Sequence, residues 1–325
     1  MGAELRVYRR RIRSVESTRK ITKAMELIAA SRIVRAQNRM NNARPYAREL
    51  SNALAHLSTD RTLEHPMFTG VENPRRAGIL LVTSDRGLAG GYNANVIKRA
   101  NELAERLGAE GREIDRFVIG RKGVAYYRFR NIPIAGSWTG FSEQPNFADA
   151  RGATDAVVSA LNATSENEVE AEGQTRRGID ELWVVYTRFV NTVSQTPTAA
   201  QLSPVQGIAD EEETPGGGEQ EQRSGEGEAR SDAGTLYEFE PEPARLIAEL
   251  LPRYVSSRIY SALLESATSE SAARRRAMKS ASDNATDLIR TYTRLANQAR
   301  QAEITQEISE IVGGADALAA TGSEE

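Results

Sequence analysis

The chain has 325 residues, a formal net charge of −3 and no cysteine, and 39% of its residues are hydrophobic. This length allows one large domain or two modest ones. The absence of cysteine excludes disulfides and thiolate metal sites. No apolar run approaches the ~20 residues that a membrane-spanning helix needs. The basic N-terminal segment has no apolar signal-peptide core, so we do not expect secretion.

Charge is strongly segregated along the chain. Residues 1–48 hold thirteen lysines and arginines and three acidic residues, a net charge of +10. Residues 209–233 hold nine acidic residues and two arginines, a net charge of −7. This separation predicts a basic docking surface and a solvated acidic segment.

Glycine is missing from residues 3–69 and from residues 235–312, whereas the middle of the chain has glycine throughout. Both glycine-free runs are charged and rich in alanine, which favours two very long helices. We expect the first helix at Ala3–Leu57, with a kink or short break at Pro45.

The second long helix is expected to begin after Pro241 and Pro243 and to end at Gly313–Gly314. Two helices of this length must pack on each other, and each has a narrow stripe of coiled-coil spacing. The first stripe is Val7, Ser14, Ile21 and Ile28, flanked by Ala24, Met25 and Ala29. The second is Ala277, Ala281, Asn284, Leu288, Thr291, Leu295, Gln298, Ala302 and Thr305.

Between the long helices, apolar runs of strand length alternate with segments of helical spacing. This alternation predicts a small parallel-sheet α/β domain. Strands are predicted at Ala77–Thr83, Arg116–Ile119, Ile132–Ser137 and Glu181–Thr187, and helices at Asn93–Leu107, Lys122–Arg128 and Phe147–Leu161.

Two acidic segments, Asn162–Gly178 and Ala209–Gly234, have few apolar residues. Neither can bury enough surface to offset the entropy lost on ordering, so we expect both to be loops.

The loop Ser84–Asn93 is rich in glycine and leads from a predicted strand into a predicted helix, where phosphates can bind. It lacks both the Walker lysine pattern and the G-x-G-x-x-G spacing, so we favour a tight turn or contact loop. The only histidines, His56 and His65, are not in a metal-binding spacing. The sequence therefore predicts no catalytic residue, no cofactor and no metal.

The cluster Arg274–Arg276 with Lys279, together with the basic first helix, is compatible with binding to nucleic acid phosphates. No aromatic residue lies near the cluster Arg274–Lys279 in sequence for stacking on bases. A solvated helix face, or a face that docks on an acidic protein, is therefore favoured over nucleic acid binding. A basic coiled-coil nucleic-acid-binding protein remains the main alternative, and an α/β enzyme that uses the glycine-rich loop is a third.

Five stretches, spread in order over nearly the whole chain, carry specific motifs. They are Ile21–Glu26 with Ala29–Ser31, Ala43–Ala47 (ARPYA), Ser84–Leu88 (SDRGL), Ala277–Ala281 with Asp283–Asn284, and Arg300–Ile308 (RQAEITQEI). Together they closely resemble the γ subunits of F-type ATP synthases. Segment 162–178 looks like an insertion found in actinobacterial members, and Ala89 stands where many relatives carry cysteine.

The resemblance implies a long antiparallel coiled coil of the N- and C-terminal helices with an inserted Rossmann-like α/β domain. It implies a central rotor shaft that couples rotation of the membrane c-ring to conformational cycling of the β catalytic sites and regulates ATPase activity. The implied partners are the α and β subunits of the catalytic hexamer, the ε subunit and the c-ring, with no nucleic acid and no membrane span. The implied location is peripheral, at the cytoplasmic face of the cell membrane.

The resemblance also implies domain limits and contact residues. The domains would be 1–62, 63–235 and 236–325, with acidic loops at 162–178 and 209–234. The contacts to the β subunit would be Lys23, Met25, Arg32, Arg86, Gly87, Leu88, Arg300, Gln301, Thr305 and Glu307. The contacts to the c-ring and the ε subunit would be Tyr237 and Glu240.

Overall fold

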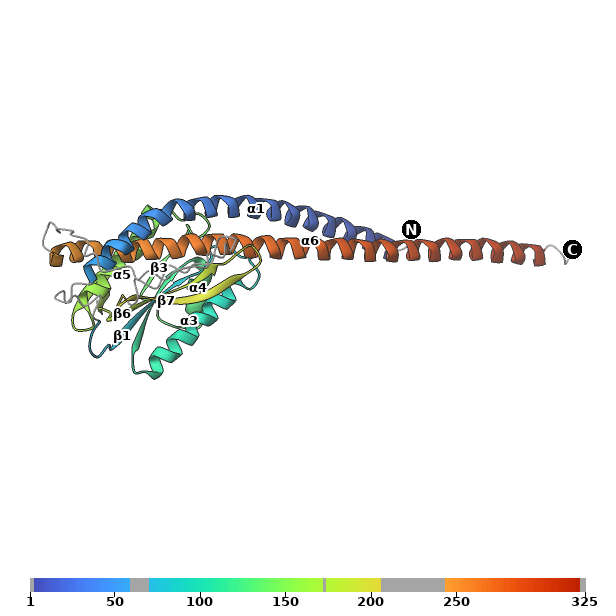
Figure 1. The fold of residues 1–325 in the computed structure, drawn as a ribbon. Coiled ribbons are helices and arrows are strands. Elements are labelled where there is room, and N and C mark those ends of the chain that lie inside the picture. The colour runs from blue at the N-terminus through green and yellow to red at the C-terminus, as the bar shows by residue number, and fades with distance from the viewer. Residues whose placement is uncertain (1–2, 59–69, 172–173, 206–242, 322–325) are drawn as a thin grey trace, which may run out of the picture. The chain divides into compact units, whose positions relative to one another are not determined.

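The computed structural model describes residues 3–58, 70–171, 174–205 and 243–321 (Figure 1). The chain divides into two compact units, one of Met1–Ala29 with Arg274–Glu325 and one of Ala30–Ala273. The two predicted long helices are present, and the predicted inserted α/β domain lies between them in sequence. The predicted domain limits near residues 62 and 235 fall outside the described residues and stay predictions.

The long helices are α1, Ala3–Ser58, and α6, Pro243–Thr321. Helix α1 continues through Pro45, so the predicted break is absent. Beyond that proline, Leu50 and Leu54 are buried in the core of the second unit, and this packing favours the helix on the far side. Helix α6 also continues through Gly313–Gly314, because glycine lowers helix stability by only about 1 kcal/mol and alanine-rich sequence follows.

In the first unit α1 and α6 form an antiparallel pair. The hydroxyls of Thr22 and Ser282 are hydrogen-bonded at 2.7 Å, and the rings of Tyr8 and Tyr292 lie 6.5 Å apart between centroids. Because residue numbers fall along α1 while they rise along α6 at these contacts, the two helices run in opposite directions. The predicted antiparallel coiled coil is therefore confirmed.

The buried seam of this pair lies one residue after the stripes predicted from the sequence. On α1 and α6, the exposed fractions of Val7, Ile21, Ile28 and Leu288 are 44, 58, 53 and 46%. Residues one position later along each stripe are buried or half-buried: Leu5, Tyr8, Ile12, Val15, Arg19, Thr22, Glu26 and Ala29 on α1, and Met278, Ser282, Ala285, Ile289, Tyr292, Ala296, Ala299 and Glu303 on α6. Of the predicted residues, Ala29 is buried, and Met25, Ala277, Ala281 and Leu295 are half-buried. The predicted centre of the seam was therefore wrong by one residue, because the seam includes small and polar residues while several larger apolar residues face outward.

The second unit is built on a five-stranded sheet in the order β3-β2-β1-β6-β7. Strands β1, β2, β3 and β6 run parallel to one another, and the edge strand β7 is antiparallel to β6. The bounds of the strands are Arg76–Val82 for β1, Glu113–Ile119 for β2, Gly136–Trp138 for β3, Glu181–Phe189 for β6 and Gln195–Ser203 for β7.

Helices cover both faces of this sheet. Alternate residues of β1 point to opposite sides: Ile79 and Leu81 pack against α3 and α4, whereas Leu80 and Val82 belong to the core shared with α5, α1 and α6. The bounds of the three shorter helices are Tyr92–Ala109 for α3, Arg121–Phe129 for α4 and Phe147–Ala163 for α5.

The predicted strands and helices of this domain are present, with three differences. Strand β3 is shorter than predicted, and the antiparallel edge strand β7 was not predicted at all. Segment 162–178 is not simply a loop, because β4, Glu168–Ala171, pairs with β5, Gln174–Arg177. Glu168 lies opposite Arg177 in this pair, and such opposite charges favour cross-strand pairing. Segment 209–234 lies outside the described residues.

Gly120, at the start of α4, is expected to be essential for the stability of this domain. Its φ is +97°, and a Cβ atom there would lie 2.2 Å from the carbonyl oxygen of Thr83. Gly120→Ala should therefore lower the free energy of unfolding by roughly 2–5 kcal/mol. Urea unfolding followed by tryptophan fluorescence measures this, because Trp138 and Trp183 lie in β3 and β6.

Gly108→Ala is the matched control, since a Cβ at that position of α3 would meet nothing within 4 Å. It should raise stability by up to about 1 kcal/mol. Equal stability of the two variants would contradict this reading of the turn before α4.

Candidate docking surfaces

The loop after β1 is fixed to its neighbours by the carboxylate of Asp85. Its Oδ2 atom accepts hydrogen bonds from the backbone N–H groups of Gly140, at 2.8 Å, and Ser142, at 3.0 Å. Its Oδ1 atom accepts one from the N–H of Arg121, at 3.1 Å, at the start of α4. One side chain therefore joins three segments that are distant in sequence.

These hydrogen bonds also set the ionisation of Asp85. Burial raises the pKa of this carboxyl, but the hydrogen bonds from Ser142, Gly140 and Arg121 lower it by more, so the pKa lies below its usual value. The ionised form is the one that the fold stabilises, and Asp85 therefore acts as a structural anchor.

The anchored loop presents two of the predicted contact residues to solvent. The side chain of Arg86 is 68% exposed, and Leu88 is 62% exposed. Leu88 has a φ of 62°, a conformation that is uncommon for a residue with a Cβ. The fold thus holds an apolar side chain outward on a fixed backbone, an arrangement that suits contact with a partner.

Several backbone N–H groups in and beside this loop donate hydrogen bonds within the protein. At the start of α4, the N–H of Arg121 donates to Asp85, and the N–H of Lys122 donates to the carbonyl oxygen of Ser84. The N–H of Ser84 itself donates to the side chain of Asn93. At the start of α3, the N–H of Tyr92 donates to the carbonyl oxygen of Ala89. These four backbone donors are therefore used within the protein.

The carboxylate of Glu143 brings two of the predicted contact residues together. Arg32 on α1 donates a hydrogen bond to its Oε2 atom, and Nη1 of Arg86 lies 3.6 Å from the same oxygen. Glu143 was not predicted from the sequence, because nothing in its local pattern places it beside α1 or the loop after β1.

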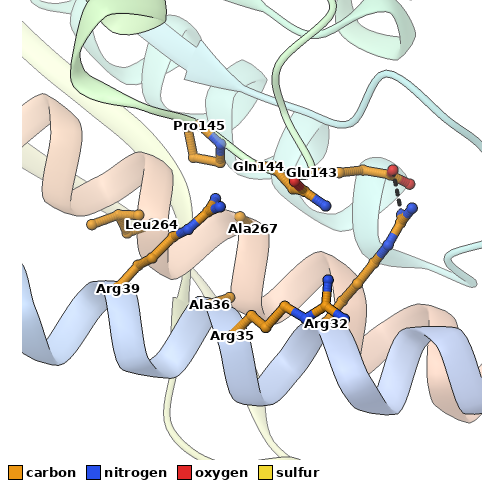
Figure 2. Close-up of a pocket in the computed structure, with 9 residues that line it drawn as sticks. All are labelled: Arg32, Arg35, Ala36, Arg39, Glu143, Gln144, Pro145, Leu264 and Ala267. Atoms are coloured by element: carbon orange, nitrogen blue, oxygen red, sulfur yellow. Dashed lines mark hydrogen bonds and ion pairs between the residues drawn. The ribbon is translucent and has the colours of Figure 1, made fainter.

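A small pocket of about 40 Å³ lies beside this ion pair (Figure 2). Arginines of α1 line one side, and Leu264 and Ala267 of α6 form part of an apolar wall. The full set of lining residues is Arg32, Arg35, Ala36, Arg39, Glu143, Gln144, Pro145, Leu264 and Ala267.

The remaining predicted contacts on described residues belong to the coiled coil. Lys23 is exposed and pairs with Glu26 at 3.0 Å, while Met25 is half-buried. Further along α6, Arg300, Gln301, Thr305 and Glu307 are all exposed. The hydroxyl of Thr305 donates to the carbonyl oxygen of Gln301, so this part of the helix partly satisfies its own polar groups.

The C-terminal part of α6 also carries an apolar face that our sequence analysis did not identify. Its four residues follow helical spacing, and their exposed fractions lie between 48 and 72%. They are Ile304, Ile308, Ile311 and Val312. Their period of three and four residues was the available signal, but we assigned this helix to a seam in a different phase.

Other predicted sites are only partly tested. Tyr237 and Glu240 lie outside the described residues. Arg274 is buried, whereas Arg275, Arg276 and Lys279 are exposed, so the basic cluster does not form one continuous surface. In the described part of the chain, no group of acidic or histidine side chains is arranged to hold a metal ion. No helix within those residues has a stretch both long and apolar enough to cross a bilayer.

Comparisons with known proteins agree with one another. A family model described as ATP synthase matches residues 4–318. The chain is 52% identical to an ATP synthase gamma chain of Acidothermus cellulolyticus over the full length of both proteins. It is 53% identical to one of Frankia casuarinae, with 98% of this chain and 99% of the relative covered.

Solved structures share the fold at lower identity. A chain of the mitochondrial ATP synthase of Euglena gracilis, in a structure of its OSCP, F1 and c-ring, has a TM-score of 0.65 and 18% identity, with 100% of this chain and 97% of that chain covered. A chain in a rotor structure of the same enzyme has a TM-score of 0.60 and 16% identity, with 94 and 100% covered.

Asp85→Asn is expected to destabilise the domain at pH 7 by about 1–3 kcal/mol, because the amide cannot accept all three hydrogen bonds. The folded-state pKa of Asp85 lies below the unfolded value of about 3.9. Its stabilising contribution is therefore complete well above that pH and is lost as pH falls through the folded-state pKa. The stability difference between wild type and variant should shrink as pH falls towards 3.

Unfolding free energies measured by urea titration at several pH values test this. Asp155→Asn is the control, since Asp155 forms only an exposed pair with Arg151 in α5. A difference between wild type and Asp85→Asn that stays constant down to pH 3 would argue against the anchor.

Proposed function

This chain belongs to the family of ATP synthase gamma chains, and we propose that it is the central rotor shaft of a proton-translocating F-type enzyme. The gamma chain is a non-catalytic subunit of ATP synthase. In this role the chain would couple rotation of the membrane c-ring to conformational cycling of the catalytic sites on the β subunits.

The observation that carries this proposal is the exposure of large apolar residues on the outer face of the coiled coil. Its seam is held partly by the hydroxyl pair Thr22–Ser282, while Ile21 and Ile28 are more than half exposed. A coiled coil that worked alone would bury such residues. Their exposure favours a helix pair surrounded by other subunits, as a shaft inside a hexamer is.

We assign contact with the β subunits to two groups of residues. Lys23, Met25, Arg32 and the loop Arg86–Leu88 would face acidic levers of the β subunits. A second group near the end of α6 would form a hydrogen-bonding catch, comprising Arg300, Gln301, Thr305 and Glu307. The exposure of Lys23, Arg86, Leu88 and all four residues of α6 supports this assignment, because a docking residue must be accessible before assembly. Met25, Arg32 and Gly87 are half-buried.

The other proposed partners are the ε subunit and the c-ring, with Tyr237 and Glu240 as the contacts. The chain would lie at the cytoplasmic face of the cell membrane as a peripheral protein. The nucleic-acid-binding alternative receives no support from the relatives, all of which are named as ATP synthase gamma chains in the comparisons above.

Co-purification tests the rotor role directly. The tagged chain, captured from gently solubilised native membranes, should bring down α, β, ε and c subunits together with ATP hydrolysis activity. Capture with nucleic acid and without these subunits would overturn the proposal.

The hairpin β4–β5 offers a regulatory hypothesis, because glutamates at 166, 168, 170 and 172 place negative charge on a chain that also carries a strongly basic helix. We expect these charges to slow hydrolysis. Replacing all four by glutamine keeps the chain length and should raise ATP hydrolysis by the assembled complex about twofold at low salt. The same variant with unchanged hydrolysis would identify the hairpin as an inert insertion.

Arg300→Glu is expected to impair coupling by placing negative charge near acidic groups of the β subunits. ATP synthesis by the assembled complex should fall roughly tenfold, equivalent to about 1.4 kcal/mol. Unfolding of the inserted domain should not change, because Arg300 belongs to the other unit. Arg253→Glu, an equally exposed reversal on the same helix, is the control. Normal synthesis in Arg300→Glu would show that the catch assignment is wrong.

A further inference from the structure

Glu143, which our sequence analysis did not consider, touches two proposed docking arginines. Its Oε2 atom accepts a hydrogen bond from Arg32 and lies 3.6 Å from Nη1 of Arg86. The two arginines come from different elements, α1 and the loop after β1. Figure 2 shows the carboxylate of Glu143 and the guanidinium of Arg32 pointing towards each other.

Exposure increases from the carboxylate outward. The side chain of Glu143 is 14% exposed, that of Arg32 is 24% exposed and that of Arg86 is 68% exposed. A negative charge in a sheltered position therefore holds two positive charges that reach solvent. Shelter from water strengthens this attraction relative to a pair on an open surface.

The surroundings contain more positive charge than Glu143 alone can neutralise. Arg35 and Arg39 line the same pocket, and both are exposed. Neither forms an ion pair with another residue in the described ranges. An acidic group of a partner would therefore meet Arg32 and Arg86, which already interact with Glu143, and also Arg35 and Arg39, which form no ion pair in the described ranges.

We propose that Glu143 is a positioning residue that competes with acidic partner groups for Arg32 and Arg86. This inference rests on the proposed rotor function, in which the same surface meets three identical β subunits in turn. Between encounters, the internal carboxylate holds the two arginines. During an encounter, the partner gains only the difference between its own ion pair and the internal one.

This competition weakens each contact without removing it. If the arginines had no internal counter-ion, a partner carboxylate would gain their full attraction and its release would be slow. A rotating surface must release each partner before it engages the next. Glu143 thus adjusts the strength of the contact to what repeated release requires.

The test is ATP hydrolysis by the assembled complex, with wild-type chain or Glu143→Gln, from about 0.01 to about 0.3 M salt. The screening length falls from about 30 Å to well below 10 Å over this range. Glu143→Gln should hydrolyse ATP about threefold more slowly at the lowest salt, and the difference from wild type should disappear at the highest. Slower release of partner carboxylates by uncompensated arginines is the physical cause.

Two further variants separate this role from a merely structural one. Adding Arg86→Gln to Glu143→Gln should restore most of the low-salt rate, because the more exposed uncompensated arginine is gone. Glu102→Gln is the matched control: Glu102 also lies between two cations, Lys98 at 3.9 Å and Arg99 at 3.5 Å, on the surface of α3. It should leave both the rate and its salt dependence unchanged.

The opposite results are equally distinct. Slow hydrolysis by Glu143→Gln at every salt concentration, with a lowered melting temperature and no rescue by Arg86→Gln, would overturn the proposal and identify Glu143 as a purely structural residue. Rates equal to those of Glu102→Gln would overturn it as well. Failure of the wild-type chain to assemble with α and β subunits would instead refute the proposed rotor function.

Discussion

The architecture depends on the burial of the two terminal helices against the sheet domain. Leu54 of α1 and Leu251 and Val255 of α6 belong to the same core as Leu80 of β1. Each helix is unbroken between this core and the coiled-coil unit.

The phase of the coiled coil shows where sequence reasoning fails in this molecule. A search for a buried stripe selects the larger apolar residues, and it therefore selected Ile21, Ile28 and Leu288. The structure exposes all three and buries Thr22 and Ser282 between the helices. The existence, length and direction of the pair were predictable from periodicity and resemblance. Which face of each helix is turned towards the other was not predictable, because large apolar residues lie on the outer surface as well as in the seam.

The inserted α/β domain was also only partly predictable from its sequence. Buried strands such as β1 were predictable because their apolar runs are continuous. Edge strand β7 contains Pro197 and is only partly buried, so its sequence does not differ clearly from that of a loop. Among the proposed contact residues, Arg32 and Arg86 were found through resemblance. Glu143 was not, because its role arises from a contact across more than a hundred residues.

Taken together, the outward-facing residues suggest how contacts of a rotating shaft are kept weak. Apolar groups such as Ile304 and Ile308 are separated by polar residues along α6, so each partner meets a narrow apolar face rather than a broad patch. Charged groups such as Arg32 have a counter-ion within the same chain. For a charged group with an internal counter-ion, the gain on contact is a small difference between two ion pairs. For the apolar residues, the gain is limited by the small area of the face. A small gain in free energy on contact permits release. In the proposed rotor, the same surface meets three β subunits in each turn, so it must release each one before it binds the next.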